Sequence, residues 1–247
     1  NHDRPVARII AERVPLTIMI GLITLFFQFL VAIPIGMYSA MRQYGKGDYF
    51  FTFMSFVGVS IPNFLLALLV MVGLFALGGI SIGGLFSPEY REAAWSLARV
   101  WDMLKHLIVP VIVIGMASTA GTVRVFRAAM LDELGKDYVK VAKAKGLTNW
   151  QASIRHAGRI ALNPILAALG WQLPRIISGA LIVSIVVGLP TTGPMLFDAL
   201  LSQDMYLAGS FILVLSAFTV FGTLISDILL ALVDPRIQYG ARGKRSA

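Results

Sequence analysis

Residues 14–40 read VPLTIMIGLITLFFQFLVAIPIGMYSA, a run in which no side chain carries a charge. Four further apolar runs cover residues 50–78, 106–126, 164–188 and 207–232. A helix of about 20 apolar residues crosses a hydrocarbon core roughly 30 Å thick. Within that core every backbone amide and carbonyl has to bond inside its own helix. The sequence therefore predicts an all-α fold, a polytopic transmembrane helical bundle with five spans.

Composition supports this class. Of the 247 residues, 57% are hydrophobic and only 14% are charged, whereas a soluble domain carries about 25% charged residues. The net charge of +8 lies mainly in the segments between the apolar runs, which favours a membrane protein over one that binds nucleic acid. The chain has no cysteine, which excludes disulfides, thiolate metal ligands and a cysteine nucleophile.

The charged segments predict a topology. Basic residues are in excess in loops 41–49 and 127–163 and in the C-terminal tail, so these are expected in the cytoplasm. Loop 79–105 balances its charges and loop 189–206 holds only two acids, so both are expected outside. This places the N-terminus outside and the C-terminus in the cytoplasm. We expect residues 1–247 to form a single transmembrane domain, preceded by one further helix in a six-helix subunit.

Several residues inside the predicted spans stand out. Pro34, Pro62, Pro110 and Pro174 are expected at span ends or kinks. Arg175 is the one charge deep in a span, and placing it there costs at least about 2.5 kcal/mol. It either lines or gates a pathway, or bonds to carbonyls freed by Pro174. Asp227 lies nearer the inner end of the last span, where a structural ion pair is favoured over contact with a substrate.

Loop 127–163 is predicted to hold short helices. Leu134-Gly135 is typical of a helix end, and a second helix is expected from Lys136 or Asp137 to Lys145, stopped by Gly146. Thr148 and Gln151 match the capping-box pattern, so a third helix should begin there and run through Arg155 and His156 toward Asn163-Pro164.

A rigid helix between two spans suits mechanical coupling, because force on it reaches both spans. The alternative is an interfacial amphipathic helix whose lysines meet anionic lipid. A DNA-binding helix-turn-helix also uses a glycine turn, but here it would sit within a few residues of two membrane spans.

The motifs of this loop also carry a resemblance. Residues 137–147 read DYVKVAKAKGL and are followed by Arg155-His156-Ala157 and Asn163-Pro164. This resembles the EAA-type loop of binding-protein-dependent ABC permeases, in particular the dipeptide/oligopeptide/nickel branch. Further motifs agree in order along essentially the whole chain: Arg4-Pro5-Val6 with Glu12 to Thr17, Arg124-Val125-Phe126-Arg127, and Asp234-Pro235-Arg236-Ile237.

The resemblance implies a function. Such a permease subunit pairs with a second homologous permease in the bacterial inner (plasma) membrane, receives substrate from an external solute-binding protein, and docks two ABC ATPase subunits. Peptide is the expected cargo, with oligosaccharide or nickel as alternatives. The implied coupling residues are Tyr138, Val141, Ala142, Lys143, Ala144, Lys145, Gly146 and Leu147.

Two departures from the family pattern matter. Lys140 and Val141 stand where the broader motif has Glu and Ala, as is common in the peptide branch. Residues 188–194 read GLPTTGP where many peptide permeases carry a Pro-Gly-Leu-Gly turn, and Ser184 stands where many relatives have a glutamate. Ser184 therefore joins Arg175 as a possible pathway or gating residue, and the substrate class stays open.

The sequence contains no G-x-x-x-x-G-K-[ST] motif to hold a nucleotide phosphate. We therefore expect no enzyme activity and no cofactor on this chain, with ATP and magnesium bound by partner subunits. His2, His106 and His156 lack metal-ligand spacing. A secondary transporter or channel would want paired carboxylates within the spans, and a membrane enzyme would need a convergent catalytic set. The sequence offers neither.

Overall fold

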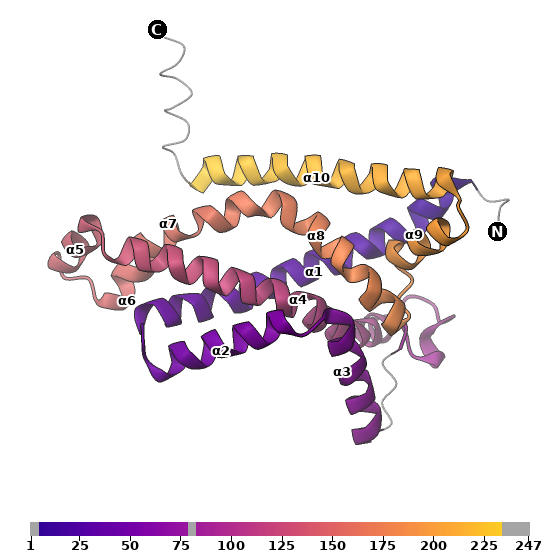
Figure 1. Cartoon of the computed structure of the whole chain (residues 1–247), viewed down its shortest axis with the longest axis horizontal. Coiled ribbons are helices and arrows are strands. Elements are labelled where there is room, and N and C mark those ends of the chain that lie inside the picture. The colour runs from indigo at the N-terminus through magenta and orange to yellow at the C-terminus, as the bar shows by residue number, and fades with distance from the viewer. Residues whose placement is uncertain (1–4, 79–82, 234–247) are drawn as a thin grey trace, which may run out of the picture. The chain divides into compact units, whose positions relative to one another are not determined.

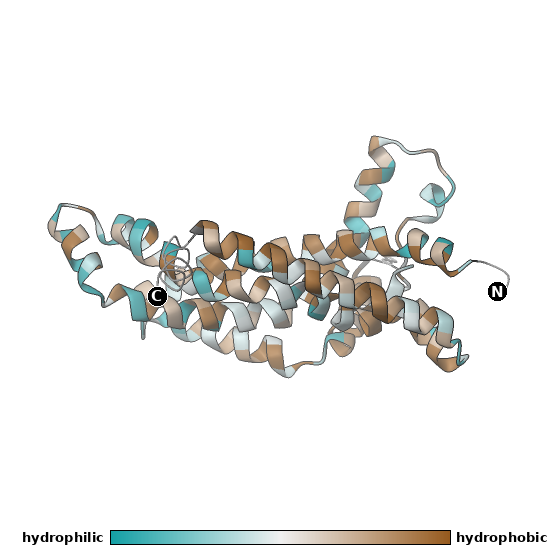
Figure 2. Cartoon of the chain, turned by 90° about the horizontal axis from the view of Figure 1, so that it is seen from above, coloured by the Kyte–Doolittle hydropathy of each residue, from teal (hydrophilic) through white to brown (hydrophobic). Residues whose placement is uncertain are grey.

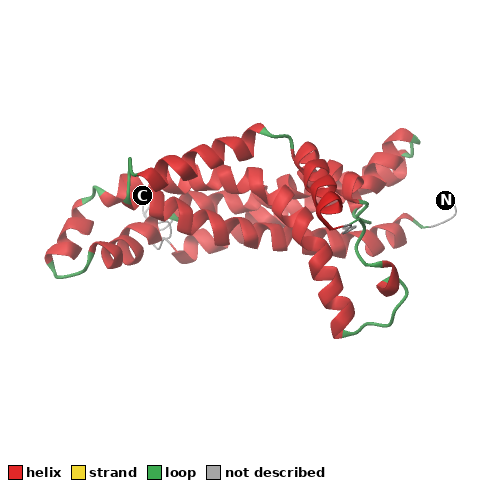
Figure 3. Ribbon diagram, turned by 90° about the horizontal axis from the view of Figure 1, so that it is seen from below, coloured by secondary structure: helices red, strands yellow, loops and turns green. Residues whose placement is uncertain are grey.

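The computed structural model describes residues 5–78 and 83–233, except for the side chain of Leu173, and every regular element among them is a helix (Figures 1 and 3). The elements are α1 (Val6–Met41), α2 (Lys46–Ser60), α3 (Asn63–Gly78), the 3₁₀ turn η1 (Pro88–Tyr90), α4 (Leu97–Leu134), α5 (Asp137–Ala144), α6 (Asn149–Ala152), the π-helix η2 (Ser153–Gly158), α7 (Arg159–Ala161), α8 (Asn163–Val187), α9 (Thr192–Leu201) and α10 (Met205–Val233). The predicted all-α class is confirmed.

Three helices, α1, α4 and α10, are each long and apolar enough to cross a membrane. Two bent pairs bring the number of candidate spans to five when each pair is taken as one span. One pair is α2 with α3, and the other consists of the two parts of α8 on either side of Leu173. Figure 2 shows hydrophobic residues along most of these long helices.

The second predicted span differs from the observed one. Residues 50–78 were expected as one helix, but α2 ends at Ser60 and α3 begins at Asn63, with a bend at the break. Pro62 lies in this break, where its ring has no N–H to donate to the preceding turn. Pro110 and Pro174 instead lie inside α4 and α8.

Helix α4 is much longer than the predicted span 106–126. Its 38 residues extend about 57 Å at 1.5 Å per residue, well beyond a hydrocarbon core of roughly 30 Å. The charges near its two ends, such as Asp102 and Arg127, were read as loop residues, yet they lie on the helix. Charged residues therefore did not mark the ends of this helix. Predicted loop 189–206 likewise contains a helix, α9.

The chain divides into two compact units, each built from three separate stretches. Unit 1 comprises residues 1–28, 59–118 and 173–218, and unit 2 comprises residues 29–58, 119–172 and 219–247. The sequence boundaries between the units fall inside α1, α4, α8 and α10 as well as near the end of α2.

Unit 1 has an apolar cluster formed by Ile9 of α1, Ala199 of α9, and Leu207, Ala208 and Phe211 of α10. The turn between α8 and α9 is fastened to α1 by two hydrogen bonds. The Arg13 guanidinium donates to the Pro190 carbonyl at 3.1 Å, and the Thr192 amide donates to Thr17 Oγ1 at 3.0 Å. The turn is thus positioned by residues about 175 positions away in the chain.

Unit 2 has the larger cluster of small and apolar residues, in which α5, α6, η2 and α7 pack on α1, α4 and α8. Its buried members are Ala40, Phe126, Met130, Val139, Ala142, Ala152, Ala157, Ala161 and Ile165. Close helix approach depends on glycine. A Cβ at Gly36 would lie 3.0 Å from the Phe126 ring, so α1 can approach α4 only without a side chain there.

Glycine also allows α8 and α10 to pack closely within unit 2. A Cβ at Gly170 would lie 2.5 Å from Thr223 Cα, and a Cβ at Gly222 would lie 2.9 Å from the Gly170 carbonyl oxygen. The Ser226 hydroxyl also donates to the Leu166 carbonyl. Helices in lipid associate through such close packing, because lipid leaves little hydrophobic force between them.

Some sequence features lie outside the described residues. These are Arg4 of the N-terminal motif, residues 79–82 of the second predicted loop, and the Asp234 to Ile237 motif with the basic tail.

Replacing Gly170 by alanine should destabilise the protein by about 1–3 kcal/mol, because the new methyl group meets backbone that cannot give way. The thermal unfolding midpoint of the detergent-purified protein should fall. Gly179→Ala is the matched control on the same helix, since nothing lies within 4 Å of its Cβ position. Equal midpoints for the two variants would contradict the close α8–α10 packing.

Candidate functional site

Helix α5 is short and begins without a side-chain cap, from Lys136 in an extended conformation. Asp137 in its first turn and Lys143 in its last turn favour the helix macrodipole. The Lys140 ammonium lies 2.9 Å from Asp137 and holds the pKa of that carboxyl below its ordinary value. Because eight residues are marginal as an isolated helix, α5 depends on packing against the rest of unit 2.

That packing determines which side of α5 is exposed. Val139 and Ala142 are 0% and 6% exposed and belong to the unit 2 cluster. Val141, by contrast, is 52% exposed and Tyr138 is 37% exposed. Residues 139 and 142 lie three apart, on one face, which is the spacing of helix neighbours.

The eight predicted coupling residues therefore divide into two groups. Ala142 is buried, and Leu147 is half-buried against the same cluster. The other six are exposed: Tyr138, Val141, Lys143, Ala144, Lys145 and Gly146. A partner could reach the second group directly, whereas Ala142 and Leu147 anchor the helix to its own chain.

Gly146 stops α5 as predicted, with a φ of +93°. The Leu147 amide donates to the Ala142 carbonyl at 3.3 Å, and the Gly146 amide donates to the Lys143 carbonyl at 3.0 Å. These two bonds form a Schellman motif, in which the residue after the helix adopts the left-handed conformation that glycine tolerates. The end of α5 thus has a defined geometry.

The predicted capping box is also present. The Gln151 amide donates to Thr148 Oγ1 at 3.2 Å, and the Thr148 amide donates to Gln151 Oε1 at 3.1 Å. The helical segment that begins there runs through α6, η2 and α7 to Ala161, as the sequence indicated.

Helix α5 packs on α6 and η2, and together they present four exposed apolar side chains: Tyr138, Val141, Trp150 and Ile154. Exposed lysines lie on the same short segment at positions 140, 143 and 145. We call these seven residues the α5–α6 surface. A rigid surface that mixes apolar and cationic groups can bind a protein partner with apolar pockets and acidic groups.

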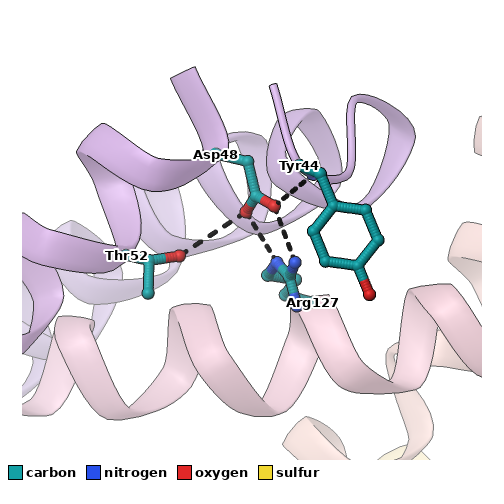
Figure 4. Close-up of polar contacts among 4 residues, drawn as sticks. All are labelled: Tyr44, Asp48, Thr52 and Arg127. Atoms are coloured by element: carbon teal, nitrogen blue, oxygen red, sulfur yellow. Dashed lines mark hydrogen bonds and ion pairs between the residues drawn. The ribbon is translucent and has the colours of Figure 1, made fainter. Parts of the chain in front are cut away.

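A buried ion pair lies in the same unit, between the beginning of α2 and the last third of α4. The Arg127 guanidinium donates to both carboxylate oxygens of Asp48, at 2.8 and 2.7 Å, and the Tyr44 amide donates to Asp48 at 2.9 Å (Figure 4). The side chains of Asp48 and Arg127 are 4% and 24% exposed. Removing Arg127 would leave the buried Asp48 carboxylate without its cationic partner, which typically costs about 3–5 kcal/mol.

Sequence reasoning missed this pair. It placed both residues in loops and noted Arg127 only as part of an arginine motif. Asp48 is the one acid in loop 41–49, and that isolated charge was the available signal, although it did not identify the partner.

The two possible pathway residues do not form one site. Arg175 and Ser184 lie nine residues apart on α8, which places them on roughly opposite faces. Ser184 is 1% exposed, whereas Arg175 is exposed and takes part in a polar or electrostatic interaction. Among the described residues, no group of three or more His, Asp and Glu side chains could hold a metal ion.

Comparisons with known proteins show that this chain matches a protein family. Residues 32–239 match the family model described as binding-protein-dependent transport system inner membrane component. The oligopeptide transport system permease protein AppB of Bacillus subtilis is 36% identical over 236 residues, which cover 95% of this chain and 73% of AppB. The corresponding OppB of Haemophilus influenzae is 30% identical over 238 residues, and that of Escherichia coli is 29% identical over 238 residues; each match covers 96% of this chain and 73% of the relative.

Two valine substitutions test which side of α5 is buried and which is exposed. Val139→Ala should destabilise the unit 2 cluster by about 1–3 kcal/mol, because it leaves a cavity. Val141→Ala removes the same atoms from an exposed position and should change stability by less than about 0.5 kcal/mol. Hydrogen exchange of the 137–147 amides measures this. Equal protection in both variants would contradict the assigned faces.

Proposed function

Because this chain belongs to the family of binding-protein-dependent inner membrane transport components, we propose that it forms part of the pathway for oligopeptides in an ATP-driven importer. Members of this family are multi-pass permease subunits without an ATPase domain of their own. Peptide as the cargo is supported by the relatives named oligopeptide permeases, which match along 95–96% of this chain.

The observation that carries the proposal is the α5–α6 surface. It is exposed, it is held on a helix whose end is fixed by Gly146, and it lies between two long helices. In this proposal an ATPase subunit docks there, with Tyr138, Val141 and the lysines as contacts. The excess of lysine and arginine around this segment supports a cytoplasmic location.

In this proposal, docking of an ATPase subunit moves the long helices to which α5 is connected. In the chain, α5 follows the end of α4 at Leu134 and is connected to α8 at Asn163 through α6, η2 and α7. Its buried residues share one apolar cluster with Phe126, Met130 and Ile165 of those two long helices. A push on α5 therefore reaches two membrane helices at once. We propose that closure of the ATPase subunits drives this motion and thereby opens the pathway.

The proposed complex holds four further components. A second, homologous permease completes the pathway, two ATPase subunits bind ATP and magnesium, and an external binding protein delivers the substrate. The proposed topology places the turn between α8 and α9 on the outer side, where Arg13 and Thr17 hold it in position.

The cargo is tested by a binding screen of the cognate external protein against peptides, oligosaccharides and nickel ions. We expect peptides alone to bind, and ATP-dependent uptake of the bound peptide by the reconstituted complex. Binding of oligosaccharides or nickel without peptides would overturn the proposed substrate class. Absence of ATP-dependent uptake of any bound solute would overturn the proposed function.

Gly146→Val tests the coupling role of α5. A β-branched residue in the left-handed region costs about 1–2 kcal/mol and should disturb the end of α5. Substrate uptake and substrate-stimulated ATP hydrolysis by the reconstituted complex should both fall. Gly135→Val is the control, because Gly135 lies before α5, has no positive φ and has open space around its Cβ position. Wild-type uptake by Gly146→Val would count against coupling through α5.

A further inference from the structure

Helix α2 is held by few buried side chains. Its 15 residues include only three buried ones, Asp48, Ser55 and Gly58. Its large apolar residues are mainly exposed, among them Tyr49, Phe50, Phe53 and Phe56. In lipid such exposed apolar groups supply little force toward another helix. The position of α2 within unit 2 therefore depends on individual contacts: the T-shaped pair of the Tyr38 and Phe51 rings, with centroids 5.8 Å apart, and a set of polar contacts.

The Asp48–Arg127 ion pair is the strongest of these contacts. Two parallel N–H···O bonds, 2.8 and 2.7 Å long, join the planar guanidinium to the carboxylate. Such a bidentate geometry resists both sliding and rotation of the two helices, which a single point contact does not. Arg124, one turn earlier on α4, adds a weaker contact, with its guanidinium 5.5 Å from the Phe56 ring.

The turn between α1 and α2 is shaped around the same carboxylate. Tyr44 adopts a φ of +63°, uncommon for a residue with a side chain, and its amide donates to Asp48 (Figure 4). Gly47 lies against the Tyr38 ring, where an added Cβ would lie 2.6 Å from ring atoms. The beginning of α2 is thus fixed to the end of α1 as well as to α4.

The α4 residues beside Arg127 belong to the same buried cluster as α5. Phe126 directly precedes Arg127 and Met130 follows it by three positions, and both are 0% exposed in the cluster that includes Val139 and Ala142. One short stretch of α4 therefore takes part both in the cluster that holds α5 and in the ion pair to α2. A displacement of this stretch would act on Arg127 and, through the ion pair, on Asp48.

We propose that Asp48 and Arg127 are positioning residues that transmit movement of the docked α5 helix to α2. This inference rests on the proposed function, because it assumes that ATPase subunits move α5. Loss of the pair should leave the rate of ATP hydrolysis largely intact, whereas opening of the pathway should no longer accompany each cycle of hydrolysis. The measurable quantity is the number of substrate molecules taken up per ATP hydrolysed.

The experiment uses the complete complex in liposomes, with the second permease, the ATPase subunits and the binding protein. Asp48→Asn and Arg127→Met should each lower uptake per ATP about tenfold in complexes purified with all their subunits. Lys46→Gln is the matched control. It removes a charge two positions from Asp48, from an exposed side chain, and should leave the ratio at the wild-type value.

A covalent link in place of the ion pair tests whether the pair transmits movement or only stabilises the fold. The chain contains no cysteine, so the double variant Asp48→Cys/Arg127→Cys can be joined by a short thiol-specific bifunctional reagent, with cysteine-free partner subunits. Uptake per ATP should be low before the reaction and rise severalfold after it. A wild-type ratio in the single variants, or a low ratio that cross-linking does not raise, would overturn the inference. Failure of the wild-type complex to take up substrate would instead overturn the proposed function.

Discussion

The absence of water inside a bilayer is the constraint on which this structure depends. Peptide groups there must bond within their own segment, so the candidate membrane spans are all helical. The same medium leaves little hydrophobic attraction between helices. Helix contacts in the protein accordingly rely on close backbone approach at Gly36 and Gly170, and on the buried pair of Asp48 with Arg127.

Helix α5, a short element between two candidate membrane spans, is held by other kinds of contact. It is held by burial of Val139 and Ala142 and by the hydrogen bonds around Gly146. The two kinds of contact meet on the last third of α4, where Phe126 and Met130 pack toward α5 and Arg127 binds Asp48.

Family membership and structure answer different questions about that surface. The family identifies a transport subunit whose energy comes from partner subunits. The structure divides the segment 137–147 into a buried side, with Ala142 and Leu147 packed into unit 2, and an exposed side, with Tyr138 and Val141.

The sequence by itself determined what depends on neighbours a few residues apart: the apolar spans, the glycine stop at Gly146 and the capping box of Thr148 with Gln151. Tertiary structure decided the rest. It determined which side of α5 is exposed and how long α4 is. It also determined that Asp48 pairs with Arg127, 79 residues away in the chain. Local patterns encode helix beginnings and ends because caps and turns are local bonds. They do not encode which distant side chain fills a buried position, since that depends on how the helices pack.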